Sequence, residues 1–500
     1  MTRALSENAE ELATDPALSA LDSPDVSGTV IRGSAMRSAA YATSILLSAA
    51  SVPLIIRALG VVDYGYFVTI TSLMTIVAGV TDAGLQNIGI REYAVLEGEA
   101  RTRMLRHLIG VRVALTAVGV LLAVGFTLVA GYKSTLVLGA VLAGVGLILQ
   151  VLQASYVVSL VATLRLGAAS VLDIVRQGAA VAFAVGLVVV GAKLLPFFLM
   201  TVVGGVVAVA LAIRLTRGLV PLLPALDVHG WWGMLKDAIP YSAATAIGIV
   251  YFRVAIIIMS LVSTGVETGY FSASFRITEV LAGIPYMLVM SVFPVLARAA
   301  QHNQERLRYS LQRTFEVALI LGVGTMLLLL VGAPFAIHVV AGRSFDPSIP
   351  ALRIQGVALI FTFLVATWGY ALLSLSHFRA LLLANAGALV LAIGLTLGLA
   401  PSHGATGAAI AMMITEICLA LTYAVVIARV RPDLRVSLRI VPVVVLAAGA
   451  GAALGLLTGV PSIVGAVIAG VLYLLILWFT GVVPNEVRDA LRRPPGAAGG

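Results

Sequence analysis

Ionisable side chains inside long apolar segments are the residues of this sequence that could do chemistry. Ser272, Arg276, Glu279, Gly283 and Tyr286 recur at alternating spacings of four and three residues, so they share one face of a helix. A guanidinium keeps its charge when water is removed and presents a planar fork of donors to a carboxylate or phosphate. Arg276 is therefore the best candidate for binding an anion, and Glu279, one turn away, is its candidate charge partner.

Other charged residues interrupt the apolar segments, and each charge at mid-membrane depth costs roughly 2.5 to 3.5 kcal/mol on insertion scales. Such a cost favours a role in binding or pairing. Asp82 is expected to pair with an arginine or to take up a proton. The candidate substrate-binding residues are Arg276, Arg253, Arg57, Ser272 and Tyr286. The candidates for ion coupling or charge pairing are Glu279, Asp82 and Glu416, with Asp173 in a weaker context.

Three arginines near predicted helix ends have a simpler interpretation. Arg57 and Arg353 lie near ends that we expect on the outer side, where a long side chain can reach the lipid headgroups. Arg112 lies near an inner end, and we expect it to be an ordinary snorkelling anchor.

Polar residues at helical spacing suggest which helices line a cavity, because polar groups turn away from lipid. Small hydroxyl residues also pack helices together, so packing and cavity lining remain equal alternatives for serine and threonine. The stripes outside 272–286 consist of Tyr41, Ser44, Ser48 and Ser51, then Ser72, Thr75, Gly79, Asp82 and Gln86, and finally Ser242, Thr245 and Arg253.

Fourteen apolar stretches carry these residues, in a chain that is 60% hydrophobic and 11% charged. Roughly 20 apolar residues of helix cross a bilayer, and the alternating ten-residue segments of a β-barrel are missing. The sequence therefore predicts an all-α polytopic membrane protein. The predicted spans are 38–59, 64–88, 108–131, 134–161, 170–192, 195–213, 238–261, 268–296, 314–340, 350–374, 380–400, 404–427, 440–458 and 461–482.

The basic residues predict the orientation of these spans. Of the 32 lysines and arginines, 24 fall on one side of the predicted membrane and three (Lys133, Lys193 and Arg343) on the other. Basic residues near helix ends stay in the cytoplasm during insertion. We therefore expect the protein in the cytoplasmic membrane, with both termini on the cytoplasmic side. The net charge of +9 is explained by this topology and by anionic lipid headgroups, with no nucleic acid partner.

A weak internal repeat predicts two halves. YGYFVTITS from Tyr64 resembles TGYFSASFR from Thr268, and AVGLVVVGA from Ala184 resembles AIGLTLGLA from Ala392, at offsets of 204 and 208 residues. The alternative is chance similarity between apolar segments. The predicted divisions are a disordered cytosolic tail (1–34), an N-terminal six-helix lobe (35–214), a cytosolic linker (215–237), a C-terminal six-helix lobe (238–430), two appended helices (431–484) and a cytosolic tail (485–500).

Several functional classes are disfavoured by simple absences in the sequence. Cys418 is the only cysteine, so disulfides within the chain and thiolate metal clusters are excluded, and the residue is interpreted as a small packing residue. The phosphate-binding pattern G-x-x-x-x-G-K-[ST] does not occur. We expect no metal and no cofactor.

Three segments resemble polysaccharide flippases of the multidrug/oligosaccharidyl-lipid/polysaccharide exporter superfamily. They are VPLIIRALGVVDYGYFVTITSLMTIVAGVTDAGLQNIGIREYA from Val52, FRVAIIIMSLVSTGVETGYFSASFRITEVLAGIPYMLVMSVFPVLARA from Phe252, and VVAGRSFDPSIPALRIQGV from Val339. The resemblance covers about residues 35–430. It implies two lobes around a V-shaped central cavity and movement of a polyprenyl-diphosphate-linked glycan, such as an O-antigen precursor of the cell envelope, by alternating access.

This resemblance also implies cationic cavity residues that hold the diphosphate, with Arg276 in the eighth helix. The first two helices contain fewer arginines than those of lipid II flippases, so lipid II itself is not the expected substrate. We expect a transporter, with proton or sodium coupling as open alternatives. The rival functions are a multidrug/cation antiporter of the same superfamily and, from another class, a membrane glycan polymerase or glycosyltransferase. The expected partners are the lipid-linked glycan and membrane lipids.

Overall fold

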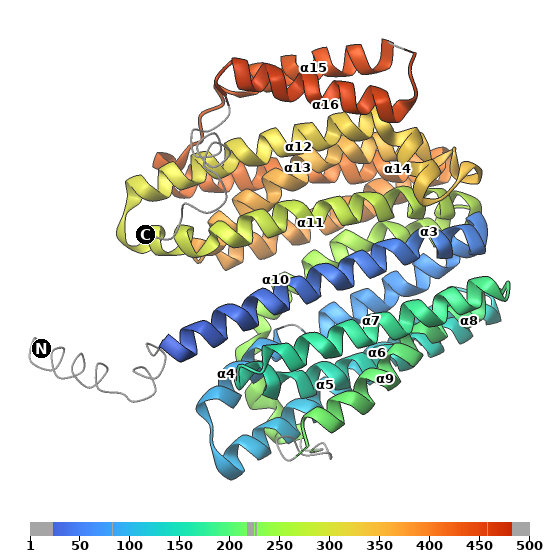
Figure 1. The fold of residues 1–500 in the computed structure, drawn as a ribbon, viewed down its shortest axis with the longest axis vertical. Coiled ribbons are helices and arrows are strands. Elements are labelled where there is room, and N and C mark those ends of the chain that lie inside the picture. Colours follow the sequence, from blue (N-terminus) through green and yellow to red (C-terminus); the bar gives the residue numbers. More distant parts are fainter. Residues whose placement is uncertain (1–23, 83, 218–224, 226–227, 458, 483–500) are drawn as a thin grey trace, which may run out of the picture. The chain divides into compact units, whose positions relative to one another are not determined.

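The computed structural model describes residues 24–82, 84–217, 225, 228–457 and 459–482, and the regular structure in this part is entirely helical (Figure 1). Residues 1–23 of the predicted tail 1–34 and the predicted tail 485–500 lie outside the described residues, as do the side chains of Tyr41, Ser44, Ser242 and Thr245, whereas residues 24–34 of the first tail are helical. The helices are α3 (Pro24–Asp82), α4 (Leu85–Val95), α5 (Gly98–Val129), α6 (Ser134–Ala162), α7 (Leu166–Val189), α8 (Leu194–Phe197), α9 (Leu199–Leu215), α10 (Val228–Val262), α11 (Gly265–His302), α12 (Gln304–Val340), α13 (Ser348–Ser374), α14 (Phe378–Val430), α15 (Val441–Leu457) and α16 (Ser462–Phe479), with the short 3₁₀ turns η1 (Arg343–Phe345) and η2 (Pro432–Leu434).

Three glycines with positive φ divide the longest helical stretches. Gly60 (φ 70°) interrupts α3 and Gly404 (φ 51°) interrupts α14, each at a place where the sequence predicts two separate spans. Gly84 (φ 85°) precedes α4, so the second predicted span ends at Asp82 and not at residue 88. The expectation that Gln86 continues the stripe of Asp82 is therefore wrong, because a left-handed residue separates the two helices.

Ten stretches of helix in the described part are long and apolar enough to cross a membrane, and two shorter apolar helices, Ala246–Val262 and Val441–Leu457, accompany them. The protein is thus an all-α, multi-pass membrane protein. The count of fourteen spans stays a prediction.

Cα packing divides the chain into two compact units, and the first comprises the described residues of Met1–Leu54 and Thr81–Ile239. Its core lies where α4 packs against α5 and α6, around Tyr93, Leu105, Leu108 and Tyr156. Apolar side chains on the facing sides of these helices exclude water and hold the bundle together.

The second unit comprises Ile55–Val80 and Pro240–Gly500, described up to residue 482. Helices α11, α12, α13 and α14 pack closely, and α15 with α16 covers α12 (Figure 1). The hydroxyl of Tyr473 on α16 donates to the carbonyl of Ile320 on α12 at 2.9 Å. The predicted lobe boundaries stay a prediction.

Two close contacts fix the ends of helices in the second unit. A Cβ added to Gly65 of α3 would lie 2.8 Å from the backbone nitrogen of Gly269 in α11, so these helices approach each other at glycines. Glu267, in the first turn of α11, accepts a hydrogen bond from the backbone N–H of Ala405 at 2.8 Å, directly after the bend at Gly404. These contacts position the helices that surround the site described next.

Candidate functional site

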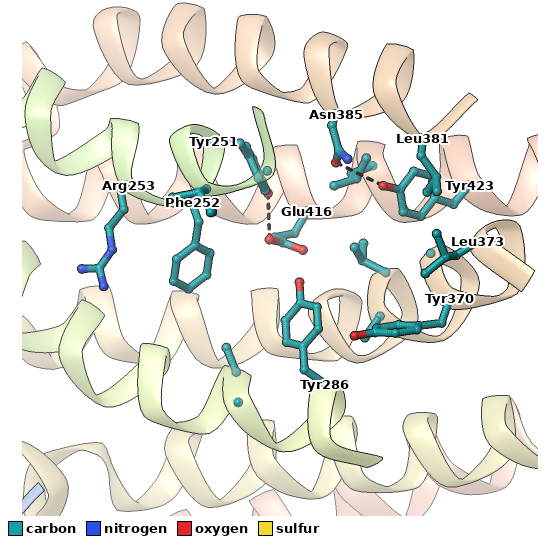
Figure 2. Close-up of a pocket in the computed structure, with 18 of the residues that line it drawn as sticks. Tyr251, Phe252, Arg253, Tyr286, Tyr370, Leu373, Leu381, Asn385, Glu416 and Tyr423 are labelled. Carbon is teal, nitrogen blue, oxygen red and sulfur yellow. Dashed lines mark hydrogen bonds between the residues drawn. The ribbon is translucent and has the colours of Figure 1, made fainter. Parts of the chain in front are cut away.

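A cavity of about 560 Å³ lies within the second unit, lined mainly by α10, α11, α13 and α14 (Figure 2), with Thr75 contributed by α3. Two kinds of polar group line it. Arg253 and Glu279, which carry opposite charges, lie at one end of the cavity. The other end presents hydroxyl and amide groups. Gly283 on α11 and Gly369 on α13 lack side chains, which leaves room between the helices.

The charged end is a cluster of three residues in which two arginines share one carboxylate. Arg276 donates to Glu279 Oε2 at 2.9 Å within α11, and Arg253 of α10 forms an ion pair with Glu279 Oε1. The three side chains are between 15% and 29% exposed, so the charges are largely withdrawn from solvent. Two positive charges and one negative charge leave the cluster with one net positive charge.

Aromatic and hydroxyl groups hold Arg253 in place. Its guanidinium carbon lies 5.7 Å from the ring centroid of Phe275, within the range of a cation–π interaction, and its Nη1 is 3.5 Å from Ser72 Oγ of α3. Phe275 in turn packs against Phe252, with ring centroids 5.1 Å apart. These packed rings restrict the rotamers of the arginine.

The other end of the cavity is built from a buried carboxylate and tyrosines. Tyr251 of α10 donates to Glu416 Oε1 at 2.7 Å, and Tyr423 donates to Asn385 Oδ1 at 3.1 Å, both within the cavity wall. Figure 2 shows Tyr286 of α11 pointing toward Glu416 from the opposite side. Glu416 is only 2% exposed, and no arginine, lysine or histidine of the described chain pairs with it.

The helical stripe from Ser272 to Tyr286 does converge on this cavity. Glu279, Gly283 and Tyr286 line it, and Arg276 reaches it through its ion pair with Glu279. Ser272 is fully buried and is not part of the wall. Its hydroxyl makes no hydrogen bond within the described part of the chain.

Arg57 and Arg353 bind backbone carbonyls and do not line the cavity. Arg57 Nη2 donates to the carbonyls of His338 and Val339, at 2.9 and 2.7 Å, at the C-terminal end of α12. Arg353 Nε donates to the carbonyl of Leu330 at 3.0 Å. A cation at a helix C-terminus satisfies carbonyls that lack intrahelical partners, and this contact occupies Arg57.

Asp82 has an arginine partner, as the sequence predicts, but the partner is Arg112. Arg112 Nη2 lies 2.6 Å from Asp82 Oδ1, and its Nη1 donates to Ser155 Oγ at 3.1 Å. The expectation that Arg112 is a snorkelling anchor is wrong: its side chain is 2% exposed, and its Nη1 and Nη2 bind Ser155 and Asp82 inside the first unit. Asp173, on α7, is half-buried and is not part of the cavity wall.

Several cavity residues escape sequence reasoning. Asn385 and Tyr423 lie in apolar segments without a neighbouring charge, so they are indistinguishable from packing residues until the helices are assembled. A weak signal exists for Tyr251, which lies two residues before Arg253. Among the described residues, no group of three or more His, Cys, Asp or Glu side chains could hold a metal ion.

Solved structures with a similar fold are membrane transporters. The lipid II flippase MurJ in an inward closed conformation aligns with a TM-score of 0.74 at 14% identity, over 90% of this chain and 99% of that one. An inward-facing multidrug resistance MATE family transporter aligns with a TM-score of 0.61 at 15% identity, over 78% and 95%. A MOP superfamily transporter from Pyrococcus furiosus gives 0.54 at 16% identity, over 82% and 96%. At these identities the likeness shows the fold.

Sequence comparison identifies the family. No curated protein sequence matches the chain significantly. The family described as "Polysaccharide biosynthesis protein" matches residues 30–300, more than half of the 500 residues, including the two longer segments that suggested polysaccharide flippases. The chain belongs to the polysaccharide biosynthesis protein family.

Proposed function

We propose that this protein is a flippase that moves a polyprenyl-diphosphate-linked oligosaccharide from the inner to the outer leaflet of the cytoplasmic membrane by alternating access. The observation that carries the proposal is the cavity of about 560 Å³ between apolar helices, which holds Arg253 and Glu279 at one end and Glu416 with tyrosine hydroxyls and an amide at the other. A diphosphate-sugar headgroup needs a polar path through hydrocarbon, whereas its lipid tail remains in the bilayer.

The charged end suits the diphosphate. Arg253 and Arg276 carry two forked guanidinium groups, the side chains best matched to phosphate oxygens. Glu279 neutralises only one of the two charges, so the cluster retains attraction for an anion. Low exposure strengthens each charge-assisted hydrogen bond, because the local dielectric constant is lower than that of water.

The other end suits the sugars attached to that diphosphate. Tyr286, Tyr370 and Tyr423 present flat rings and hydroxyl groups, and Asn385 adds an amide. Such groups cover an apolar sugar face while exchanging hydrogen bonds with its hydroxyls. The cavity volume falls within the range of about 300 to 1,000 Å³ typical of sites for small molecules. One ligand with an anionic part and a neutral polar part therefore fits the whole wall.

A multidrug/cation antiporter is the second candidate, and Glu416 is the observation in its favour. A buried carboxylate surrounded by tyrosines can attract a cation. Arg253 in the same wall opposes this function, because a cation would enter a cavity whose other end is positively charged. A membrane glycan polymerase or glycosyltransferase has no comparable support from the cavity.

The topology predicted from the basic residues completes the proposal. We infer that both termini lie in the cytoplasm, so the cavity would accept its substrate from the leaflet where lipid-linked glycans are assembled. Movement of the two predicted lobes would then alternate access to the two faces of the membrane.

Depletion of the protein tests the function against its rivals. Chromatography of the lipid-linked glycan pool should show a fully built intermediate that accumulates in the inner leaflet. An intermediate truncated by one sugar would favour a glycosyltransferase. Unchanged lipid-linked glycans together with increased sensitivity to cationic drugs would favour the antiporter.

Arg276 provides the residue-level test. Arg276→Ala should abolish export at normal membrane abundance, and Arg276→Lys should restore only part of it, because lysine keeps the charge but loses the forked geometry. The matched control is Arg298→Ala, an exposed arginine on the same helix, which should export normally. The double variant Arg276→Ala/Glu279→Ala should restore any lost abundance without restoring export. Export by the double variant would make the arginine a packing residue.

A further inference from the structure

Asn385 is the only side chain of α14 that carries an amide, and it lies in the wall of the main cavity. Figure 2 shows it beside Tyr423, at the end of the cavity that lies beyond Tyr286 and Glu416 from Arg253. An amide within an apolar helix costs free energy unless its polar atoms form hydrogen bonds. Its partners therefore indicate what this end of the cavity can bind.

Tyr423, from the second part of α14, orients this amide. Its hydroxyl donates to Asn385 Oδ1 at 3.1 Å, and its side chain is 3% exposed. A Cβ added to Gly369 of α13 would lie 3.3 Å from the Tyr423 ring, so the ring has little room to turn. The hydrogen bond satisfies the carbonyl oxygen of the amide and leaves its Nδ2 group as a donor. Among the described residues Nδ2 has no hydrogen-bond partner, and protein atoms do not cover it.

The cavity is therefore lined by a hydrogen-bond donor next to an acceptor. Asn385 Nδ2 is the donor. Tyr423 Oη is the acceptor, because a hydroxyl oxygen that has given its hydrogen to one partner can still accept another. A secondary amide of a ligand matches both groups at once: its carbonyl oxygen accepts from Nδ2, and its N–H donates to Oη.

Apolar side chains surround this pair of polar groups. Leu373, Phe378 and Leu381 line the same cavity, and Figure 2 places the two leucines at the end that holds Asn385 and Tyr423. A methyl group next to the ligand amide would cover these side chains and remove apolar surface from water. A bare hydroxyl would leave them uncovered.

A charged substituent fits this end less well. Among the described residues, Arg253 is the basic residue of the cavity wall, and it lies at the other end. A sugar carboxylate would therefore lie near Glu416 without a counter-charge. An ammonium group would meet the N–H donors of Asn385, which repel it. The neutral acetamido group combines the hydrogen-bonding pattern with the methyl.

We propose that this end of the cavity recognises an N-acetylated amino sugar of the lipid-linked glycan, which rests on the proposed function. Asn385 Nδ2 donates to the acetamido carbonyl, and the acetamido N–H donates to Tyr423 Oη. Glu279 and Tyr286 are separated by about 10 Å along α11, at 1.5 Å rise per residue. With the diphosphate at the charged end, the sugar linked to it lies along this stretch, and the acetamido group belongs to the second sugar.

Equilibrium binding to the purified full-length protein in lipid nanodiscs tests the assignment with polyprenyl-diphosphate disaccharides. The second sugar is N-acetylglucosamine in one probe, glucose in another and glucuronic acid in a third. The parent protein should bind the first probe at least about tenfold more tightly than the other two, because a site built to hydrogen-bond a group rejects analogues that lack it.

Variants of the two polar residues then locate the preference. Asn385→Leu should lower the ratio of the first two affinities to about one by weakening only the acetamido probe. Tyr423→Phe should lower it in part, because it removes the acceptor and the bond that orients the amide. Thr422→Val is the matched control: its exposed hydroxyl donates to the carbonyl of Cys418 within α14, and its variant should keep the full ratio.

The outcomes separate this assignment from the proposed function. Equal affinities of the parent protein for the glucose and N-acetylglucosamine probes, or tighter binding of the glucuronic acid probe, overturn the assignment and leave the flippase intact. A preference that persists in Asn385→Leu overturns the placement of the acetamido group. A preference that follows an acetamido group on the first sugar does the same. Absence of binding by the parent protein to every probe overturns the proposed function itself.

Discussion

Asp82 at the end of α3 and Arg112 of α5 form an ion pair of 2.6 Å in which the arginine is 2% and the aspartate 38% exposed. Asp82→Asn would leave a buried guanidinium without its counter-charge. Removing one partner of a buried pair costs about 3 to 5 kcal/mol, and the partial exposure of Asp82 places this case at the lower end. We expect a lower melting temperature of the purified protein, measured by fluorescence in detergent.

The double variant Asp82→Asn/Arg112→Met is the control for that change. An apolar side chain of similar length fills the space without a charge, so part of the lost stability should return. A double variant that is less stable than Asp82→Asn would contradict the assigned pairing.

The effect of changing Glu279 on substrate affinity distinguishes two roles for this carboxylate: competing with the substrate anion or orienting the two arginines. If the carboxylate occupies the place of the substrate anion between Arg253 and Arg276, then Glu279→Gln should bind a polyprenyl diphosphate more tightly, because competition for the guanidinium groups is relieved. We expect at least a fivefold lower Kd in nanodiscs, which corresponds to about 1 kcal/mol. Glu279→Asp should stay close to the parent value. Weaker binding by Glu279→Gln would mean that Glu279 orients the arginines.

Gly65 should tolerate no side chain where α3 meets α11. A Cβ at this position would lie 2.8 Å from the backbone of Gly269, and overpacking of this kind costs about 1 to 3 kcal/mol. We expect Gly65→Ala to lower the melting temperature. Gly394→Ala on α14 is the matched control, because nothing lies within 4 Å of its added Cβ. It should be neutral or slightly stabilising, since alanine favours a helix more than glycine does. Equal effects of the two variants would disprove the close approach.

Single cysteines test the orientation. In a Cys418→Ala background, cysteines at Ser263 and Ser462 should react with an impermeant thiol reagent added outside intact cells, and a cysteine at Ser310 should react only after the membrane is opened. The expectation follows from the distribution of 24 against three basic residues on the two sides. Labelling in the opposite pattern would reverse the proposed direction of transport.

The sequence predicts the class of fold well because hydrophobic length and helical spacing are local properties. It also predicts that Arg276 and Glu279 share a face, since residues three apart on a helix are neighbours. It does not predict that Arg253 joins the same carboxylate, because that contact depends on how α10 packs against α11. For the same reason the sequence predicts Arg112 as a snorkelling anchor: its position along the helix is local information, whereas its contact with Asp82 is not.

The hydrogen bond from the Ala405 amide to Glu267 has a mechanical consequence. Glu267 lies in the first turn of α11, about three turns before Glu279, and Ala405 begins the part of α14 that carries Glu416. A helical segment is stiff along its length. The hydrogen bond therefore connects the starts of two stiff segments that reach opposite ends of the main cavity. A tilt of α11 caused by a ligand on its arginine would be transmitted through Ala405 and would change the surroundings of Glu416.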